Sequence, residues 1–395
     1  MFAMLSFPRR SLAAALLLAG LALQTTAVLA DQDDQDDARD PVVLSFSTVG
    51  DSRQDPVNPD STTLPLSGQD ARWLQNTKAW SRIMRSIEAQ KSDFLFFNGD
   101  MIMGYGKADV PADTSLSGIL KSDLMAFYKQ YGFWRGMVAD LMETGTYVVP
   151  VPGNHEVQCK ACGKKAQEVN ENAWRDNMGD LILDTARLDS MFPDWATASN
   201  FDATNHPQVG GADPVTTAQN QLSYSFDFRE SHFVVMNTDA VGYDGHAPVN
   251  WLAQDMADAQ ARGAKHFFVF GHKPAYSYHY EGSDPKPSGF DADPANQKAF
   301  WDLMEQYGGT YFCGHEHIFN MTQPRVSTGG KAWQVLVGSG GSPFETSVAT
   351  SVPTDRMYAW ATVKVRQSGK VEIRAFGFDD QYGPTKLIQK AKLPH

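Results

Sequence analysis

The sequence predicts an α/β fold, and two features of the chain lead to that prediction. Short runs of β-branched and aromatic residues alternate with longer segments whose apolar residues recur at helical spacing. Strands that alternate with helices form parallel sheets, because each helix returns the chain to the same end of the sheet. Among the 395 residues, 42% are hydrophobic and 20% are charged, which is typical of a globular protein with a large core.

Three strands and two helices account for the first part of this pattern. We predict strands at residues 41–49, 94–97 and 146–151, and helices at 73–90 and 123–143. A glycine follows each strand within two residues and allows the backbone to turn sharply. Ligands of parallel sheets bind beyond the carboxyl ends of the strands. Polar residues just after these runs are therefore candidate site residues.

The second part begins with an insertion and ends in a strand-rich region. Residues 157–220 contain few periodic patterns, so we predict a long inserted loop that is partly helical at 172–188. Loops of this length commonly form lids or binding walls. A hairpin, two helices and five further strands are predicted at 222–228 with 232–236, 250–262, 265–270, 294–307, 310–313, 333–337, 358–365 and 371–376.

The N-terminal segment predicts export. An arginine pair precedes an apolar run at residues 12–23, which is too short to span a bilayer with normal flanks. We therefore predict a signal peptide at residues 1–30, of the general or the twin-arginine type, and a periplasmic or secreted location. Residues 31–40 form an acidic tail that we expect to be disordered. Residues 41–395 then form a single domain, without stable membrane insertion once the signal is removed.

The formal net charge of −12 argues against two classes of partner. Such a surface repels nucleic-acid backbones and anionic lipid headgroups, so we expect neither to bind. A small phosphate can still bind where metal ions cancel its charge.

The three cysteines suggest a local disulfide. Cys159 and Cys162 form a C-x-x-C pair, and no further ligands for a zinc knuckle lie nearby. In an oxidising compartment, a disulfide is favoured over free thiols. Cys313 lies in an apolar run and is predicted to be a core residue.

Metal-competent residues follow five of the apolar runs, and the first such residue of each run comes directly after a glycine. They are Asp51, Asp100, Asn154, His272, and His315 with His317. Residues i and i+2 of a strand or tight turn point to the same side, so the last two can face one site. Oxygen and imidazole ligands without thiolate suit zinc, manganese or iron. We expect Asp100 to bridge two ions about 3.5–4 Å apart, an arrangement that promotes in-line displacement at phosphorus.

The ordered set Gly-Asp-x-x, Gly-Asp, Gly-Asn-His-Glu, Gly-His and Gly-His-x-His resembles the calcineurin-like metallophosphoesterase superfamily. The resemblance covers nearly all of residues 41–395. The hairpin before Gly271-His272 and the glycine-rich turn at 338–341 look like those of purple acid phosphatases and related bacterial phosphohydrolases. The resemblance implies a four-layer β-sandwich of mixed sheets flanked by helices, with a dinuclear metal site at the strand ends.

The resemblance also implies roles for the site residues. One ion would bind Asp51, Asp100 and His317, and the other would bind Asp100, Asn154, His272 and His315. The cofactors would be two divalent or trivalent ions of manganese, zinc or iron. His155 would contact the phosphate and protonate the leaving oxygen.

The chain departs from the family pattern at two positions. Many members have histidine two residues after the first aspartate, where this chain has Arg53. The first ion then has three recognisable protein ligands, and we expect it to be weakly bound, exchangeable or absent. The purple enzymes have a tyrosine three residues after the second aspartate, where this chain has Met103, and Tyr105 comes two residues later. We interpret Arg53 either as a clamp for the substrate phosphate or as the partner of a loop carboxylate.

These features favour an exported phosphomonoesterase that attacks a small phosphorylated substrate with a hydroxide activated by two metals. A phosphodiesterase acting on cyclic nucleotides, nucleotides or phospholipid headgroups is the alternative on the same scaffold, because fold and ligands do not separate the two. A protein that binds metal or phosphate without catalysis is the third interpretation.

Overall fold

The computed structural model describes residues 40–53, 68–193, 200–278, 287–344 and 355–393, and only the backbone of residues 68–76. The expected signal peptide and all but the last residue of the expected tail lie outside the described residues, so both stay predictions. Contacts divide the chain into residues 1–42 and a compact unit of residues 43–395, which carries the sheets and the site.

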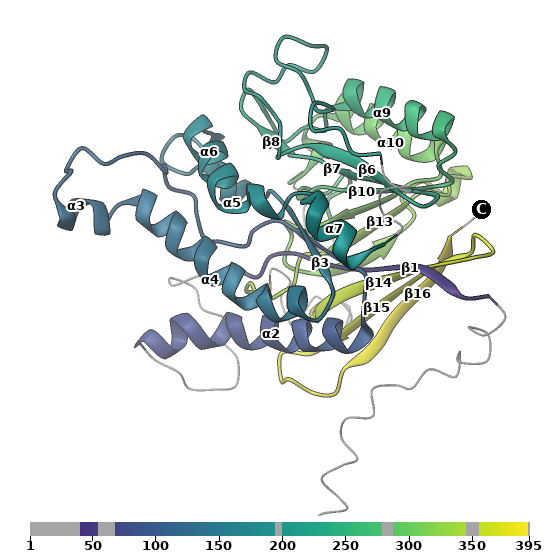
Figure 1. Ribbon diagram of the computed structural model, residues 1–395, viewed down its shortest axis with the longest axis horizontal. Coiled ribbons are helices and arrows are strands. Elements are labelled where there is room, and N and C mark those ends of the chain that lie inside the picture. The colour runs from purple at the N-terminus through teal and green to yellow at the C-terminus, as the bar shows by residue number, and fades with distance from the viewer. Residues whose placement is uncertain (1–39, 54–67, 194–199, 279–286, 345–354, 394–395) are drawn as a thin grey trace, which may run out of the picture. The chain divides into compact units, whose positions relative to one another are not determined.

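Two six-stranded sheets form the centre of the fold (Figure 1). The first has the order β16-β15-β14-β1-β2-β3, with β1 Val42–Val49, β2 Phe94–Asn98, β3 Tyr147–Val151, β14 Tyr358–Arg366, β15 Val371–Phe378 and β16 Lys386–Leu393. The second has the order β12-β13-β11-β10-β7-β6, with β6 Tyr224–Phe228, β7 Ser231–Val235, β10 His266–Phe270, β11 Thr310–Cys313, β12 Phe319–Thr322 and β13 Trp333–Val337. Both sheets are mixed: β1-β2-β3 and β7-β10-β11-β13 are parallel, whereas β14-β15-β16, β6-β7 and β12-β13 are antiparallel.

The two sheets pack face to face through aromatic side chains. Successive residues of a strand point to opposite faces of the sheet. Phe46 of β1 points inward, where its ring centroid lies 4.9 Å from that of Phe268 and 5.6 Å from that of Phe312. Phe96 stacks on Phe270 with ring centroids 3.8 Å apart. All of these rings are buried, and their removal from water is the main force that holds the sheets together.

Helices cover the outer face of each sheet (Figure 1). The four longest helices among the described residues are α2 Gly68–Gln90, α4 Asp123–Glu143, α9 Val249–Arg262 and α10 Pro294–Gln306. On the first sheet, Trp80 of α2 and Trp134 of α4 pack edge-on against Phe97. Their ring centroids lie 5.0 and 5.1 Å from that of Phe97, respectively. On the second sheet, α9 and α10 share a separate buried cluster with residues of β7, β10 and β11. This helix–sheet–sheet–helix order confirms the predicted four-layer sandwich.

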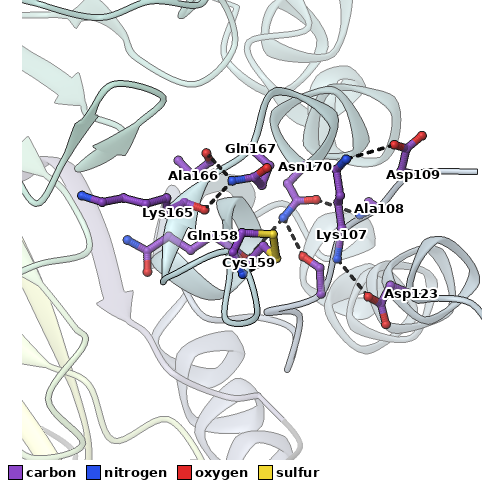
Figure 2. Close-up of a disulfide and its surroundings, with 12 residues drawn as sticks. Lys107, Ala108, Asp109, Asp123, Gln158, Cys159, Lys165, Ala166, Gln167 and Asn170 are labelled. Atoms are coloured by element: carbon purple, nitrogen blue, oxygen red, sulfur yellow. Dashed lines mark hydrogen bonds and ion pairs between the residues drawn. A yellow bond between two sulfur atoms is a disulfide. The ribbon is translucent and has the colours of Figure 1, made fainter.

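The insertion contains more regular structure than the sequence predicts. A short hairpin is closed by the expected disulfide between Cys159 and Cys162, whose Cα atoms are 5.1 Å apart (Figure 2). Two separate helices replace the single predicted helical stretch. These elements are β4 Gln158–Cys159, β5 Lys165–Ala166, α6 Glu168–Met178 and α7 Thr185–Met191.

Asn170 of α6 joins the hairpin to the segment that follows the second aspartate motif (Figure 2). Its amide nitrogen donates to the carbonyl oxygens of Gly106 at 3.0 Å and Gln158 at 3.2 Å, and its Oδ1 accepts from the nitrogen of Ala108 at 2.8 Å. Because Asn170 is buried, these bonds satisfy polar groups that water does not reach. The two segments therefore form one packed wall beside the end of β3.

Two strands and several short elements are absent from the sequence-based prediction. The strands are β12 and β16, and the short elements include α3 Leu116–Leu120, α5 Asn154–Val157, β8 Asp239–Ala240 and β9 Tyr243–Asp244. Among the residues that the structure describes, none of the helices combines the length and apolar character needed to cross a bilayer.

A buried ion-pair network lies at the start of β7, at the opposite end of the strand from the site. His232 Nδ1 is 2.7 Å from Asp227 Oδ1, and its Nε2 is 2.9 Å from Asp255 Oδ2. Arg262 also donates to Asp227, at 2.7 Å. Burial alone would lower the pKa of His232, but the two carboxylates outweigh burial and raise it above its ordinary value. The network therefore holds the imidazolium form.

The free energy of unfolding should depend on pH through His232. Its folded pKa lies above its unfolded value, so its contribution is fully present below an unfolded pKa of about 6.5 and is lost as the pH rises through the folded pKa. Near about pH 6, His232→Asn should cost about 3–5 kcal/mol, because it leaves buried carboxylates without their partner. Urea unfolding from about pH 6 to about pH 9 should show this cost shrinking. A cost independent of pH would contradict the assignment, with His206→Asn as the control for loss of a histidine.

Candidate metal centre

The carboxyl ends of five strands bring all six predicted ligands together. Asp51 follows β1, Asp100 follows β2, Asn154 opens α5 after β3, His272 follows β10, and His315 and His317 follow β11. All are buried except His315, which is half-buried. The parallel pairing of β1 with β2 and of β10 with β11 aligns these ends, as the sequence predicts.

The backbone is strained at three of these positions. Asp51, Asp100 and His315 have φ angles of 61°, 54° and 74°, in the left-handed region that non-glycine residues rarely adopt. Each such residue costs on the order of 1–3 kcal/mol and persists only where the surroundings enforce it. Here neighbouring glycines permit the close approach: a Cβ on Gly99 would lie 2.6 Å from His272 Nδ1, and one on Gly314 would overlap the Asp51 carboxylate.

Asp100, Asn154, His272 and His315 form what we call the histidine cluster. Asn154 Oδ1 lies 2.9 Å from both His272 Nε2 and His315 Nδ1. His272 Nε2 lies 3.2 Å from Asp100 Oδ1. The other ring nitrogen of His272 donates to the carbonyl of Asn98 at 2.7 Å, which directs Nε2 into the cluster.

Asp51, Asp100 and His317 form what we call the aspartate cluster. Asp51 Oδ2 accepts from the nitrogen of His315 at 3.0 Å. Asp51 Oδ1 is buried without a hydrogen-bond partner among the described residues, and it lies 3.7 Å from His317 Nε2. Ligand atoms of Asp51, Asp100 and His272 all lie within 4.8 Å of one another, so the two clusters are contiguous.

The charges in these clusters are strongly coupled. Burial raises the pKa of Asp51 well above its ordinary value. Burial would also raise the pKa of Asp100, but the imidazoles of His155 and His272 outweigh it and hold that pKa well below the usual range. In turn, Asp100 and Asp51 outweigh burial at His272 and raise its pKa to about 10. Two buried carboxylates this close require a positive charge beside them.

The donor set fits transition-metal ions. Carboxylate, amide and imidazole ligands converge, and His272 and His317 each donate their other ring N–H to a backbone carbonyl, as metal-ligating histidines do. Ligand atoms bound to one ion each lie about 2.0–2.2 Å from it, which sets the distance between them. The distances between ligand atoms within each cluster are of about this size, so each cluster has the dimensions of an ion site. An ion would also give the unpaired Oδ1 of Asp51 a partner.

Arg53 and His155 stand beside the aspartate cluster. Arg53 Nε donates to His155 Nε2 at 3.2 Å and lies 3.9 Å from Asp100 Oδ2, and its Nη1 is 3.4 Å from His317 Nε2. His155 Nδ1 contacts the carbonyl of Met103, and burial lowers the pKa of His155 to about 4. The neutral ring therefore presents its lone pair to Arg53. These contacts place Arg53 beside the predicted ligands. The loop at residues 54–67, which could supply the carboxylate of the second interpretation, lies outside the described residues, so both interpretations of Arg53 stay predictions.

Glu156 organises the turn that carries Asp100, a role that the sequence analysis missed. Its carboxylate accepts from the backbone nitrogens of Asp100 at 2.9 Å, Met101 at 2.8 Å, Ile102 at 3.1 Å and Gly153 at 2.8 Å. Burial raises its pKa to about 7. The spacing of Gly153 and Glu156 is that of a capping box, which is the signal that marks this role in the sequence.

Tyr105 is the second residue whose role the sequence analysis missed. Its ring centroid lies 3.7 Å from that of His155, and its hydroxyl bonds to the amide nitrogen of Asn154. Burial raises the pKa of Tyr105 well above its ordinary value, so the phenol stays protonated. Tyr105 therefore supports Asn154 in the histidine cluster.

Glu156→Gln should destabilise the protein, because the amide nitrogen would face a group of backbone donors that the carboxylate now satisfies. Leaving such buried groups unpaired should cost at least about 1–3 kcal/mol. Urea unfolding in the presence of a chelator would measure this cost independently of ion binding. Glu143→Gln, at the exposed end of α4, is the matched control. A free energy of unfolding equal to that of the wild type would contradict this role.

Comparison with solved structures finds proteins of similar fold. A purple acid phosphatase from yellow lupin seeds has a TM-score of 0.53 at 12% identity, with 88% of this chain and 53% of the lupin chain covered, so this chain spans about half of that protein. A dimetal phosphatase from Danio rerio has a TM-score of 0.44 at 12% identity, with 89% and 99% covered. At this low sequence identity, the similarity to the lupin enzyme shows a shared fold and nothing about function. A search of curated protein sequences found no match.

A match to a protein-family sequence model shows which family the chain belongs to. The model described as calcineurin-like phosphoesterase matches residues 73–319, which is more than half of the chain. The matched segment runs from α2 to the first residue of β12 and includes five of the six predicted ligands, whereas Asp51 lies outside it, nearer the N-terminus. The chain belongs to the calcineurin-like phosphoesterase family.

Proposed function

We propose that this protein is an exported phosphomonoesterase that uses two metal ions. The observation that carries the proposal is the convergence of the aspartate and histidine clusters at the strand ends, with Arg53 and His155 beside them. Membership of the calcineurin-like phosphoesterase family supports metal-dependent hydrolysis of phosphoesters. The substrate is a small phosphorylated molecule, because a net charge of −12 disfavours larger polyanions.

In this proposal each cluster holds one ion, and Asp100 is shared. Manganese, zinc and iron all suit the oxygen and nitrogen donors. When bound, the ions supply positive charge that stabilises the phosphoryl group and lowers the pKa of water. The buried, fixed carboxylates and imidazoles keep this charge in place, since strained turns and close-packed glycines leave the ligands little freedom.

His155 and Arg53 are the residues that handle the phosphate. The contact of His155 Nδ1 with the Met103 carbonyl leaves the Nε2 lone pair facing the site. This nitrogen would first take up the proton released by the attacking water and then pass it to the leaving oxygen. Arg53 presents two nitrogens on this side of the site, and a guanidinium binds two phosphate oxygens at once. The phosphate of a monoester carries more negative charge than that of a diester, so it binds the Arg53 guanidinium more strongly. Arg53 therefore favours monoesters as substrates.

Activity assays would test the proposal. Protein reconstituted with manganese, zinc or iron should hydrolyse p-nitrophenyl phosphate faster than bis(p-nitrophenyl) phosphate, and a chelator should abolish both activities. His155→Ala should lower kcat by about 10²–10⁴-fold without loss of metal, because it removes only the proton donor. His206→Ala is the matched control.

Two outcomes would overturn the proposal. Faster hydrolysis of the bis-ester would assign a phosphodiesterase, and metal binding without turnover of either ester would assign a non-catalytic binding protein.

Export is a further part of the proposal. The Cys159–Cys162 disulfide supports an oxidising compartment. Expression of the whole chain in a host with both export routes should yield a shortened protein outside the cytoplasm. Replacing Arg9 and Arg10 with lysine should block export only if the twin-arginine route is used. Full-length protein retained in the cytoplasm would contradict export.

A further inference from the structure

Arg53 uses the same atom of His317 that an ion would need. His317 Nδ1 donates to the carbonyl of Pro343 at 2.7 Å, so the neutral ring carries its lone pair on Nε2. Arg53 Nη1 lies 3.4 Å from that Nε2, within hydrogen-bond distance. One lone pair accepts either the hydrogen bond or the bond to an ion, so the two partners exclude each other.

The guanidinium is also held in place by neighbouring groups. The backbone nitrogen of Arg53 donates to the carbonyl of Asp100 at 3.0 Å, and its Nε donates to His155 Nε2 at 3.2 Å. The side chain is only 11% exposed, and Nε lies 3.9 Å from Asp100 Oδ2. A tethered cation has a high effective concentration at its site, whereas an ion must come from solution.

The histidine cluster has no comparable competitor. Within the described part of the chain, no lysine or arginine lies within hydrogen-bond distance of Asn154 Oδ1, His272 Nε2 or His315 Nδ1, the atoms that face one another. The nearby Lys273 is engaged with Asp239, at 2.7 Å. An ion therefore enters the histidine cluster without displacing a tethered cation.

We propose that Arg53 and the first ion are alternatives at the aspartate cluster. The histidine cluster then binds its ion tightly, and the aspartate cluster binds an exchangeable ion that enters only when Arg53 leaves His317. The inference rests on the proposed function, because it takes the two clusters as the two ion sites. A phosphate gives Arg53 a second partner, so phosphate binding and entry of the first ion should favour each other.

Metal titration tests this inference without measuring activity. Metal-free protein would be dialysed against increasing Mn²⁺ or Zn²⁺, and bound metal would be counted by mass spectrometry. The wild type should bind one ion at least about tenfold more tightly than the second. Arg53→Ala should tighten the second ion by about tenfold or more, because the competitor is gone. Arg85→Ala, on the exposed side of α2, should behave like the wild type.

Two further variants identify the weak site. His317→Ala should remove the weak ion and keep the tight one. Arg53→Lys, which replaces the two contacting nitrogens with a single ammonium, should give an intermediate affinity for the second ion. Inorganic phosphate should tighten the second ion more in the wild type than in Arg53→Ala.

Three results would overturn the inference. They are two ions of equal affinity in the wild type, a second ion unaffected by Arg53→Ala, and loss of the tight ion in His317→Ala. Failure of every variant to bind metal would instead refute the proposed function itself.

Discussion

The structure depends on a pair of buried carboxylates at the ends of neighbouring parallel strands. Asp51 and Asp100 lie with ligand atoms within 4.8 Å of each other and of His272, and both are removed from water. Such a pair is unfavourable unless positive charge lies beside it. The rise in the pKa of His272 and the position of Arg53 both show how the chain supplies that charge from its own side chains. Bound ions would supply it more strongly.

The scaffold holds this unfavourable arrangement because the side chains around it are buried and packed together. The aromatic layer around Phe46 and Phe96 fixes the strands from which the site residues project. At the strand ends, the carboxylate of Glu156 gathers four backbone donors, so the turn that carries Asp100 cannot relax. Strain at Asp51, Asp100 and His315 is offset by this packing. The ligands are thereby positioned before any ion or substrate arrives, which reduces the cost of ordering them on binding.

The sequence predicts those parts of the fold that local patterns determine. Helix α4 begins and ends where its apolar periodicity does, because Ser122 caps its start and Phe127, Tyr131 and Trp134 share one buried face. Strand β16 was missed, because it lies at the sheet edge and Ala391 is its only buried residue, which leaves no alternation to detect.

In the candidate site, too, local patterns predict some features and not others. The six predicted ligands could be identified from the sequence because five of them directly follow a glycine at the end of an apolar run and His317 lies two residues after His315. The contacts of Arg53 with His155 and His317 join residues 102 and 264 positions apart, and no local pattern encodes them. The support given by Glu156 and Tyr105 depends on backbone groups and ring contacts that form only after the strands align.

The most direct test of this account is the position of bound metal in a crystal of the protein grown with Mn²⁺ and measured by anomalous scattering. We predict a strong peak within bonding distance of Asp100, Asn154, His272 and His315, and a weaker one between Asp51 and His317. Absence of any peak among these residues at saturating Mn²⁺ would contradict the account.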